Sequence, residues 1–262
     1  PHPSPLDMVP GIAQSCNAYF ANVYRRIIEK YPTPQEGVDT WAGHLRSFGL
    51  GEYLGSDLST GRPGKIPTAK YYNAIYNYPT YKWFSTATIS NAIGQGEVLM
   101  TPIQLANMTA AIANRGWFYT PHILKEIGDQ PIKDKEFTEK KITTIDPKHF
   151  EPVVEGMHQV YKAGTASALQ VPGIEIAGKT GTAENFTKID GKRVQLTDHS
   201  IFIAFAPVDN PKIAIAIFVE NGYWGGRYAG RIAGLMIEKY LKGDITRKDM
   251  ENWILTHSLE EE

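Results

Sequence analysis

Residues 174–182 read Ile-Glu-Ile-Ala-Gly-Lys-Thr-Gly-Thr, and this stretch does most to decide the fold. Its opening alternation of apolar and polar residues predicts a strand that runs to Thr182. Two strand-forming runs follow at 200–206 and 213–220, and the turn residues at 209–211 predict that these runs form an antiparallel hairpin. Helical patterns precede and follow the strands. The sequence therefore predicts an α/β (α+β) fold in which helices cover an antiparallel sheet.

Apolar spacing and start signals predict the helices outside this sheet. They are expected to start at or near Ser15, Val38, Thr101, Asp146 and Ile232. In the third of these helices, an apolar stripe continues through Ile103, Ala106, Ala110 and Ala113, and Gly116 ends the helix. Residues 51–81 and the segment around Gly191 read as loops, and 122–145 reads as an exposed hairpin.

The bulk composition excludes several kinds of function. The chain has 262 residues, with 27 Lys and Arg against 28 Asp and Glu, so a nucleic-acid or anionic-membrane surface is not expected. The longest apolar run, 213–219, is far too short to cross a bilayer. A single cysteine, Cys16, excludes an internal disulfide. Because the first residue is Pro1 rather than methionine, we expect a piece of a longer protein.

Residues 173–180 fit the Walker A pattern Gly-x4-Gly-Lys-Thr, which would indicate a P-loop nucleotide binder. A phosphate cradle needs a strand before the first glycine, a flexible loop between the glycines and a helix that starts at the lysine. Here strand-forming residues lie between the glycines, and Gly181 directly follows the threonine. The context therefore disfavours nucleotide binding.

Short segments spread along the chain together resemble a known family. Ser15-Cys16-Asn17 fits the Ser-x-Asn element, and 179–181 fits the Lys-Thr-Gly element, of the serine acyl-transferases that open β-lactams. Residues 93–96 and 101–106 resemble the Gly-Gln-Gly and Thr-Pro-x-Gln-Leu-Ala segments of class B penicillin-binding proteins, and the hairpin of 202–220 resembles their closing strands. The chain is similar to elongation-type, penicillin-binding protein 2-like D,D-transpeptidases over nearly its whole length. This resemblance implies a β-lactamase/transpeptidase-like fold with a helical subdomain.

One element of that family is missing. The Ser-x-x-Lys element, which in the family carries the nucleophile and precedes Ser-x-Asn, occurs nowhere in the 262 residues. We therefore expect residues 1–262 to be a peptidoglycan D,D-transpeptidase domain that lacks its N-terminal part, so that this chain alone is inactive. The alternative is a catalytically inactive module that binds a peptidoglycan stem peptide or a partner.

The resemblance implies catalytic roles for Ser15, Asn17 and Lys179. Taken alone, the Ser15 hydroxyl would read as a helix cap. In the family's mechanism it relays a proton, whereas Asn17 bonds the substrate amide and orients the base lysine. Lys179 supplies positive potential that favours the terminal carboxylate of the substrate.

The residues after Lys179 are implied to bind the substrate. The hydroxyls of Thr180 and Thr182 would hold its carboxylate, and the N–H of Thr182 would form half of the oxyanion hole. Gly181 would leave room for the substrate strand to lie flat against this edge of the sheet.

Two further stretches contain residue types that are common at functional sites. Asp198-His199-Ser200 contains the residues of a hydrolase triad, but consecutive strand residues point to opposite faces and cannot converge. We expect His199 to be a structural residue that forms hydrogen bonds. Residues 223–226 are expected either to border a cleft or to form a surface turn.

The sequence leaves a metal site open and predicts no cofactor. Cys16 is expected to be a small buried side chain, or else a metal ligand together with His2 or Asp7 and groups outside these residues.

The resemblance also implies ligands, partners and a location. Peptidoglycan stem peptides and β-lactam antibiotics are the expected ligands, and a SEDS-type glycosyltransferase and other elongation-complex proteins are the expected partners. The expected location is the extracytoplasmic (periplasmic) face of the bacterial cytoplasmic membrane, with attachment only through an N-terminal anchor outside these residues.

Overall fold

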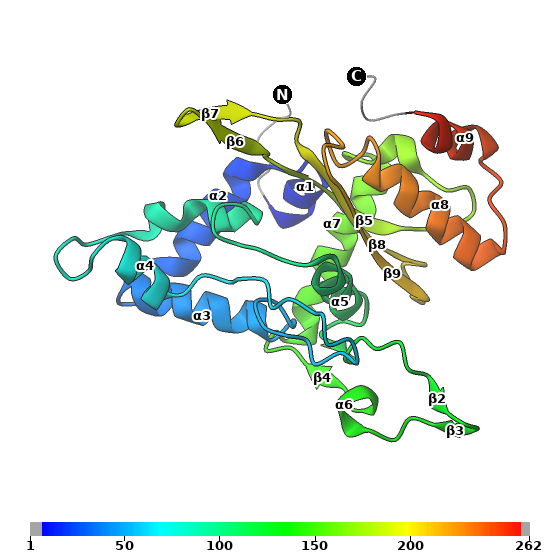
Figure 1. Cartoon of the computed structure of the whole chain (residues 1–262), viewed down its shortest axis with the longest axis horizontal. Coiled ribbons are helices and arrows are strands. Elements are labelled where there is room, and N and C mark those ends of the chain that lie inside the picture. Colours follow the sequence, from blue (N-terminus) through cyan, green and yellow to red (C-terminus); the bar gives the residue numbers. More distant parts are fainter. Residues whose placement is uncertain (1–6, 258–262) are drawn as a thin grey trace. The chain divides into compact units, whose positions relative to one another are not determined.

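The computed structural model describes residues 7–257, and the chain divides into two compact units. Among the described residues, unit 1 contains 16–149, and unit 2 combines 7–15 with 150–257. Figure 1 shows their elements coloured along the sequence. In the part of the chain that the structure describes, no helix is long and apolar enough to cross a membrane.

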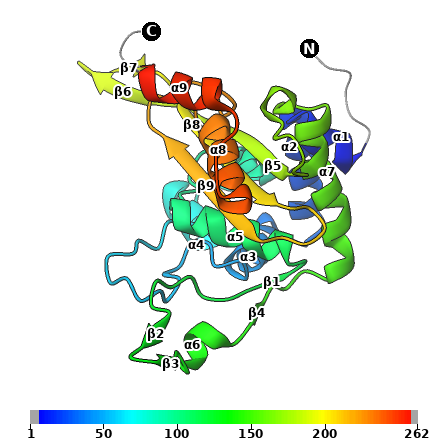
Figure 2. The same cartoon turned by 90° about the vertical axis from the view of Figure 1, so that its right-hand side faces the viewer.

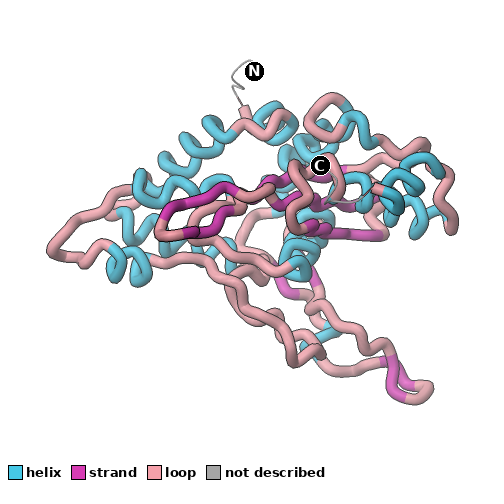
Figure 3. The backbone as a smooth tube through the Cα atoms, turned by 45° about the horizontal axis from the view of Figure 1, so that its top comes forward, coloured by secondary structure: helices cyan, strands magenta, loops and turns pink. Residues whose placement is uncertain are grey.

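Unit 1 is mostly helical, with short strands. Its elements are α2 (Asn17–Ile28), α3 (Pro34–Arg46), α4 (Ala69–Ile75), the 3-10 helix η1 (Ser85–Ile93), α5 (Pro102–Ala113), β1 (Trp117–Phe118), β2 (Glu126–Ile127), β3 (Gln130–Pro131), α6 (Lys135–Thr138), β4 (Lys141–Ile142) and η2 (Pro147–His149). Strands β2 and β3 pair at the end of a long loop excursion (Figures 1 and 3), within the segment predicted as an exposed hairpin. The prediction of an unbroken loop over 51–81 was wrong, because α4 lies within it.

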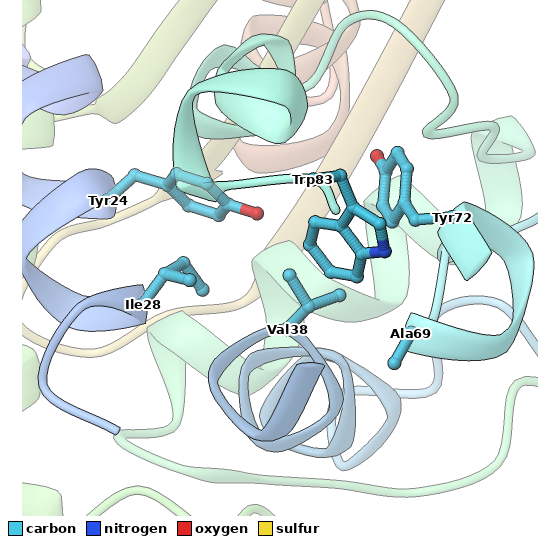
Figure 4. Close-up of a cluster of buried hydrophobic side chains, with 6 residues drawn as sticks. All are labelled: Tyr24, Ile28, Val38, Ala69, Tyr72 and Trp83. Atoms are coloured by element: carbon cyan, nitrogen blue, oxygen red, sulfur yellow. The ribbon is translucent and has the colours of Figure 1, made fainter. Parts of the chain in front are cut away.

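The core of unit 1 combines apolar side chains with a buried polar network. Figure 4 shows the apolar cluster, which α2, α3, α4 and the segment before η1 build from Tyr24, Ile28, Val38, Ala69, Tyr72 and Trp83. Asn91 Nδ2 donates to the hydroxyls of Tyr24 (3.3 Å) and Tyr72 (2.9 Å). Burial raises the pKa of both tyrosines, so their hydroxyls stay protonated and the network fixes how the helices pack.

Helix α5 begins as predicted, but its most buried side chain near the start is polar. A capping box opens it: Thr101 Oγ1 accepts from the Gln104 N–H (3.3 Å), and the Thr101 N–H donates to Gln104 Oε1 (3.0 Å). Of the predicted apolar stripe, Ala113 is buried, Ala106 and Ala110 are half-buried and Ile103 is 50% exposed, whereas the polar Gln104 is fully buried. The Gln104 amide donates to the carbonyls of Gly49, Glu52 and Pro63. This side chain therefore satisfies loop carbonyls that an apolar residue would leave without partners.

Unit 2 contains the three-stranded sheet. Its elements are α1 (Met8–Ala13), α7 (Phe150–Lys162), η3 (Ser167–Leu169), β5 (Ala177–Ala183), β6 (Phe186–Ile189), β7 (Lys192–Gln195), β8 (His199–Ala206), β9 (Ile213–Val219), α8 (Ala229–Lys242) and α9 (Lys248–Thr256). The strand order is β5-β8-β9 and both pairings are antiparallel, which confirms the predicted sheet and hairpin. Strands β6 and β7 form a second hairpin around Gly191, where the sequence had suggested a loop.

Helices cover one face of this sheet. Helix α7 packs on β5, and α8 packs on β8 and β9, where Figure 2 shows it in front of the strands. The ring of Phe202 lies at the centre of this face and meets the Tyr161 ring of α7 edge-on, with centroids 5.8 Å apart. A Cβ added to Gly230 of α8 would lie 3.2 Å from the same ring. The side chains that alternate with Phe202, at Ile201 and Ile203, are only half-buried.

Helix α9 is held on α8 by one buried carboxylate. The Glu238 side chain is fully buried and accepts from Arg247 Nε at 3.0 Å. The guanidinium of Arg231 stacks over the Trp253 ring at 3.9 Å. The sequence did not predict this helix.

Candidate active site

The Lys-Thr-Gly-Thr stretch lies on β5, at the edge of the sheet. Thr180 pairs with Phe202 and Thr182 with Ser200 on β8, and no described strand pairs with the other side of β5. The strand starts at Ala177 rather than at Ile174, because Gly173 takes the left-handed conformation (φ 74°) and closes a turn. An edge strand presents unpaired backbone N–H and C=O groups, which an extended peptide can pair with.

Lys179 is a half-buried cation without an anionic partner. Its Nζ donates to Ser15 Oγ (2.7 Å) and to the backbone carbonyl of Thr180 (2.9 Å), and no carboxylate of the described residues forms an ion pair with it. Burial lowers the pKa of Lys179 to about 8. An ammonium that is desolvated but not neutralised is unfavourable for stability, and such groups concentrate at sites that bind or react with an anion.

Close helix packing brings Ser15 to this lysine. Helix α1 lies against α7 and the turn that follows it, and both have a glycine at the contact. An added Cβ would lie 2.8 Å from the Ile12 side chain at Gly156 of α7, and 2.3 Å from the Ala13 carbonyl at Gly164, just after the helix. The Thr165 N–H donates to the same Ala13 carbonyl (3.3 Å). Since α7 also packs on β5, the end of α1 is held beside the strand that carries Lys179.

Ser15 is not a helix cap. Cys16 is the N-cap of α2, no side chain caps that end, and Ser15 stands before it with φ 52°. A left-handed backbone is uncommon for a residue with a side chain and has an energetic cost, and such residues cluster at functional sites. In Ser15, this left-handed backbone occurs together with the hydrogen bond that the hydroxyl accepts from Lys179.

The three predicted catalytic residues are brought together only in part. Ser15 and Lys179 are in contact, as described above. Asn17 is the first residue of α2, is exposed, belongs to unit 1 and follows Ser15 by two positions. Its role stays a prediction.

Thr180 has a partner that sequence reasoning missed. Its Oγ1 lies 2.8 Å from Thr165 Oγ1, in the segment after α7. No local pattern marks Thr165, because its place depends on how the end of α7 packs against β5. The helix stop at Gly164 was the only available hint.

The glycine after Thr180 lies close to two neighbouring segments of unit 2. A Cβ added to Gly181 would lie 3.2 Å from Ile201 Cβ, and one added to Gly225 would lie 2.6 Å from the Gly181 carbonyl. The Gly225 N–H also donates to Thr182 Oγ1 (3.4 Å). The loop that follows β9 therefore rests directly on this part of β5, and this close approach requires a glycine at position 225.

The comparison with known families agrees with this geometry. Residues 2–238 match the model of the penicillin binding protein transpeptidase domain. The chain belongs to this family. The resemblance drawn from the motifs is thereby confirmed, and so is the predicted fold class.

Three relatives of this penicillin-binding transpeptidase-family chain show what it is similar to and over what share of each protein. The chain is 33% identical to "Peptidoglycan D,D-transpeptidase MrdA" of Acinetobacter baumannii over 252 residues, which cover 93% of the chain and 35% of that protein. It matches Pseudomonas aeruginosa PBP2, solved in complex with WCK 5153, at 30% identity and a TM-score of 0.72, covering 91% of this chain and 50% of that one. It also matches Helicobacter pylori PBP2, solved with MreC, at 29% identity and a TM-score of 0.68, covering 90% and 40%. The chain spans about a third of the length of the curated relatives it matches.

The apparent triad of this transpeptidase-family chain does not converge. Asp198 Oδ1 accepts from Gln195 Nε2 (3.0 Å), His199 Nδ1 accepts from the Asn221 N–H (3.1 Å), and Ser200 Oγ donates to the Trp224 carbonyl (2.9 Å). Each of the three thus serves a different loop contact, and His199 forms a structural hydrogen bond as predicted.

A metal site is not evident in the described part of the domain. Cys16 is buried with a free thiol, and residues 7–257 contain no cluster of three or more His, Cys, Asp or Glu that could hold a metal. His2, one of the two suggested co-ligands, lies outside the described residues.

Proposed function

We propose that this chain supplies the Ser-x-Asn and Lys-Thr-Gly sides of a peptidoglycan D,D-transpeptidase active site, with the nucleophilic serine and its lysine on a segment outside these residues. The observation that carries the proposal is the Lys179 ammonium, which has no described anionic partner, donates to the Ser15 hydroxyl and lies on an edge strand next to Thr180. This arrangement suits the binding of a peptide that ends in a carboxylate.

The substrate would lie along β5 as an added strand. Its terminal D-alanine carboxylate would face Lys179 and the hydroxyls of Thr180 and Thr182. The penultimate D-alanine carbonyl would then lie at the Thr182 N–H, the proposed donor to the developing oxyanion. One such donor contributes about 3 kcal/mol to transition-state stabilisation.

Acyl transfer would use Ser15 as a proton relay. The nucleophilic serine gives its proton to its lysine and attacks the penultimate D-alanine carbonyl, so that an ester bond forms and the bond to the terminal D-alanine breaks. The leaving nitrogen needs a proton, and the Ser15 hydroxyl can deliver one while Lys179 donates to the Ser15 oxygen. A pKa of about 8 keeps Lys179 mostly protonated at pH 7 while leaving proton release accessible. An amine of a second stem peptide then attacks the ester and forms the cross-link.

A nucleotide-binding function is not supported. A P-loop lysine stands at the start of a helix, after a loop between its two glycines. Here Gly173 lies in a turn, and both Gly178 and Lys179 lie within strand β5. The second alternative, an inactive module that binds stem peptides or a partner, shares the same residues, and the labelling experiment below separates it.

Partners and location are also proposed on the strength of the relatives. The Helicobacter pylori PBP2 was solved with MreC, and we propose that the intact protein likewise joins elongation-complex proteins, with a SEDS-type glycosyltransferase among them. Because its polymer substrate is outside the cytoplasm, the proposed place of action is the extracytoplasmic face of the bacterial cytoplasmic membrane.

Labelling with a fluorescent penicillin tests the proposed function. The full-length protein should become covalently labelled, and Lys179→Ala should reduce the rate of labelling at least 100-fold. Lys188→Ala, which removes an exposed lysine from β6 of the same unit, is the matched control and should label normally. An intact protein that contains Ser-x-x-Lys but takes no label would favour the inactive module.

A further inference from the structure

An open pocket lies directly beside the proposed transpeptidase site. It has a volume of about 470 Å³, and its walls include Thr182, Gln195, Leu196, Asp198, Tyr223 and Trp224. These residues come from the end of β5, from the end of β7 and the segment that follows it, and from the loop after β9. The pocket therefore shares Thr182 with the site described above.

Asp198 is the only charged residue that lines this pocket among the described residues. Its Oδ1 accepts from the Asn185 N–H (3.3 Å) and from Gln195 Nε2 (3.0 Å). No cation of residues 7–257 forms an ion pair with Asp198, and its second carboxylate oxygen accepts no hydrogen bond from them. The carboxylate is half-buried and held in place by neutral donors. Such a group attracts a cationic ligand, because a bound cation would compensate its partial desolvation.

The rest of the pocket suits an aliphatic chain that ends in a cation. Leu196 is 40% exposed and Trp224 is 57% exposed, so both present apolar surface. The Tyr223 and Trp224 rings meet edge-on, and Arg227 stacks over them at 4.4 and 5.1 Å. This stack fixes the aromatic wall. Methylene groups would lie against the wall, and an ammonium would reach Asp198.

Strand register shows which part of a donor peptide would meet Asp198. Thr182 pairs with Ser200 and Ala183 with His199, so Asp198 lies one position further along the sheet, away from Lys179. If the terminal carboxylate lies at the Thr180 and Thr182 hydroxyls, within reach of the Lys179 ammonium, and the scissile carbonyl lies at the Thr182 N–H, the preceding residue of the peptide continues toward Asp198. Each extended residue spans about 3.3 Å, so the next side chain comes within reach of the pocket.

We propose that the Asp198 pocket binds the side-chain ammonium of a diamino acid that directly precedes the two terminal D-alanines of the donor peptide. This inference rests on the proposed function and adds a specificity determinant to it. A donor whose side-chain amine is free would acylate the protein faster than one whose amine is blocked.

The test compares two synthetic donors on the full-length protein. One peptide ends in L-lysyl-D-alanyl-D-alanine, and the other carries Nε-acetyl-lysine at the same position. The rate of acylation is measured in a single turnover without an acceptor, by competition with a fluorescent penicillin. We expect about a tenfold preference for the free amine. Asp198→Asn should reduce this preference to about twofold or less, because asparagine keeps an oxygen for Asn185 and Gln195 but removes the charge.

Two variants provide the controls. Asp198→Glu keeps the carboxylate and should retain most of the preference. Asp209→Asn removes an exposed carboxylate at the other end of β8 and should retain all of it. Equal rates for both peptides on the wild-type protein would overturn the inference, as would an unchanged preference in Asp198→Asn.

The outcomes also separate this inference from the proposed function. If the wild-type protein labels with penicillin but reacts with both peptides at the same rate, only the proposed Asp198 subsite is overturned. Failure to label at all removes the transpeptidase function and the subsite together. A charge effect that appears only when an acceptor amine is added would place the cation on the acceptor, and would overturn the assignment to the donor.

Discussion

Replacing Lys179 by methionine should stabilise unit 2 while abolishing the proposed function. Burial lowers the pKa of this amine from 10.5 to about 8. Since one pKa unit corresponds to about 1.4 kcal/mol, the folded state carries a penalty of roughly 3 kcal/mol whenever the amine is charged in both states. Lys179 is only half-buried, and solvent screening reduces this penalty to about 2 kcal/mol. Methionine has a similar length and no charge to desolvate.

The stability difference between Lys179→Met and the wild type should depend on pH. At pH 7 the amine is protonated in the folded and the unfolded chain, so the full penalty applies and Lys179→Met should be about 1–2 kcal/mol more stable than wild type. Between pH 8 and pH 10.5 the folded protein releases this proton while the unfolded chain still holds it. The stability of the wild type relative to the variant therefore rises with pH through this window, and the advantage of the variant falls to near zero above it.

Urea denaturation of both proteins at pH 7 and pH 9.5 measures this difference. Lys188→Met, on the exposed face of β6, is the matched control and should change stability by less than about 0.5 kcal/mol at either pH. A variant that is equally or less stable than wild type at pH 7 would refute the reasoning. A gain that is the same at both pH values would refute it too.

Three further predictions concern packing. Gly164→Ala should lower the rate of penicillin labelling of the full-length protein at least tenfold, because the added Cβ would lie 2.3 Å from the Ala13 carbonyl and displace the end of α1; normal labelling would show that α1 does not position the site. Gln104→Leu should lower the free energy of unfolding by about 2–4 kcal/mol in urea denaturation, because its amide donates to three loop carbonyls, and a loss below about 1 kcal/mol would contradict this. Glu238→Ala should cost about 3–5 kcal/mol by the same measurement, since it leaves Arg247 buried without its carboxylate. Increased hydrogen exchange in α9 should accompany that loss, and unchanged protection would count against the role of Glu238 in holding the helix.

Local signals made the centre of unit 2 predictable. The Asp-Asn-Pro turn and the continuous apolar run of β9 identify β8 and β9 without knowledge of any neighbour. The strand predicted over 174–182 overlaps β5, although its alternating residues precede the observed start at Ala177. The β6–β7 hairpin was not predicted, although its turn has a recognisable sequence. Asp190-Gly191 is a typical pair for a two-residue hairpin turn, and both residues take the positive φ values of such a turn. Its strands are polar and exposed, so no apolar periodicity drew attention to them.

Tertiary contacts decided the features that the sequence did not reveal. The buried face of α5 follows the positions of loop carbonyls contributed by residues 49–63, which hydropathy cannot locate. Ser15 was expected near a helix start, and its motif was informative, but its hydrogen bond to Lys179 depends on α1 packing against α7. The positions of Thr165 and Asp198 beside β5 depend on how the neighbouring segments pack, so their residue types alone did not predict these positions.

Unit 2 is assembled from two stretches of chain that are far apart in order of synthesis. The hydrogen bond between Ser15 and Lys179 joins residues separated by 164 positions. A ribosome adds about 5–20 residues per second, so α1 leaves it on the order of ten seconds or more before β5 exists. During that interval Ile12 has no α7 to cover it, and the apolar turn around it is open to chaperones and to misassociation. A circular permutant that begins at Phe150 and joins the two original ends would make the two stretches of unit 2 contiguous in sequence and should speed the folding of the unit.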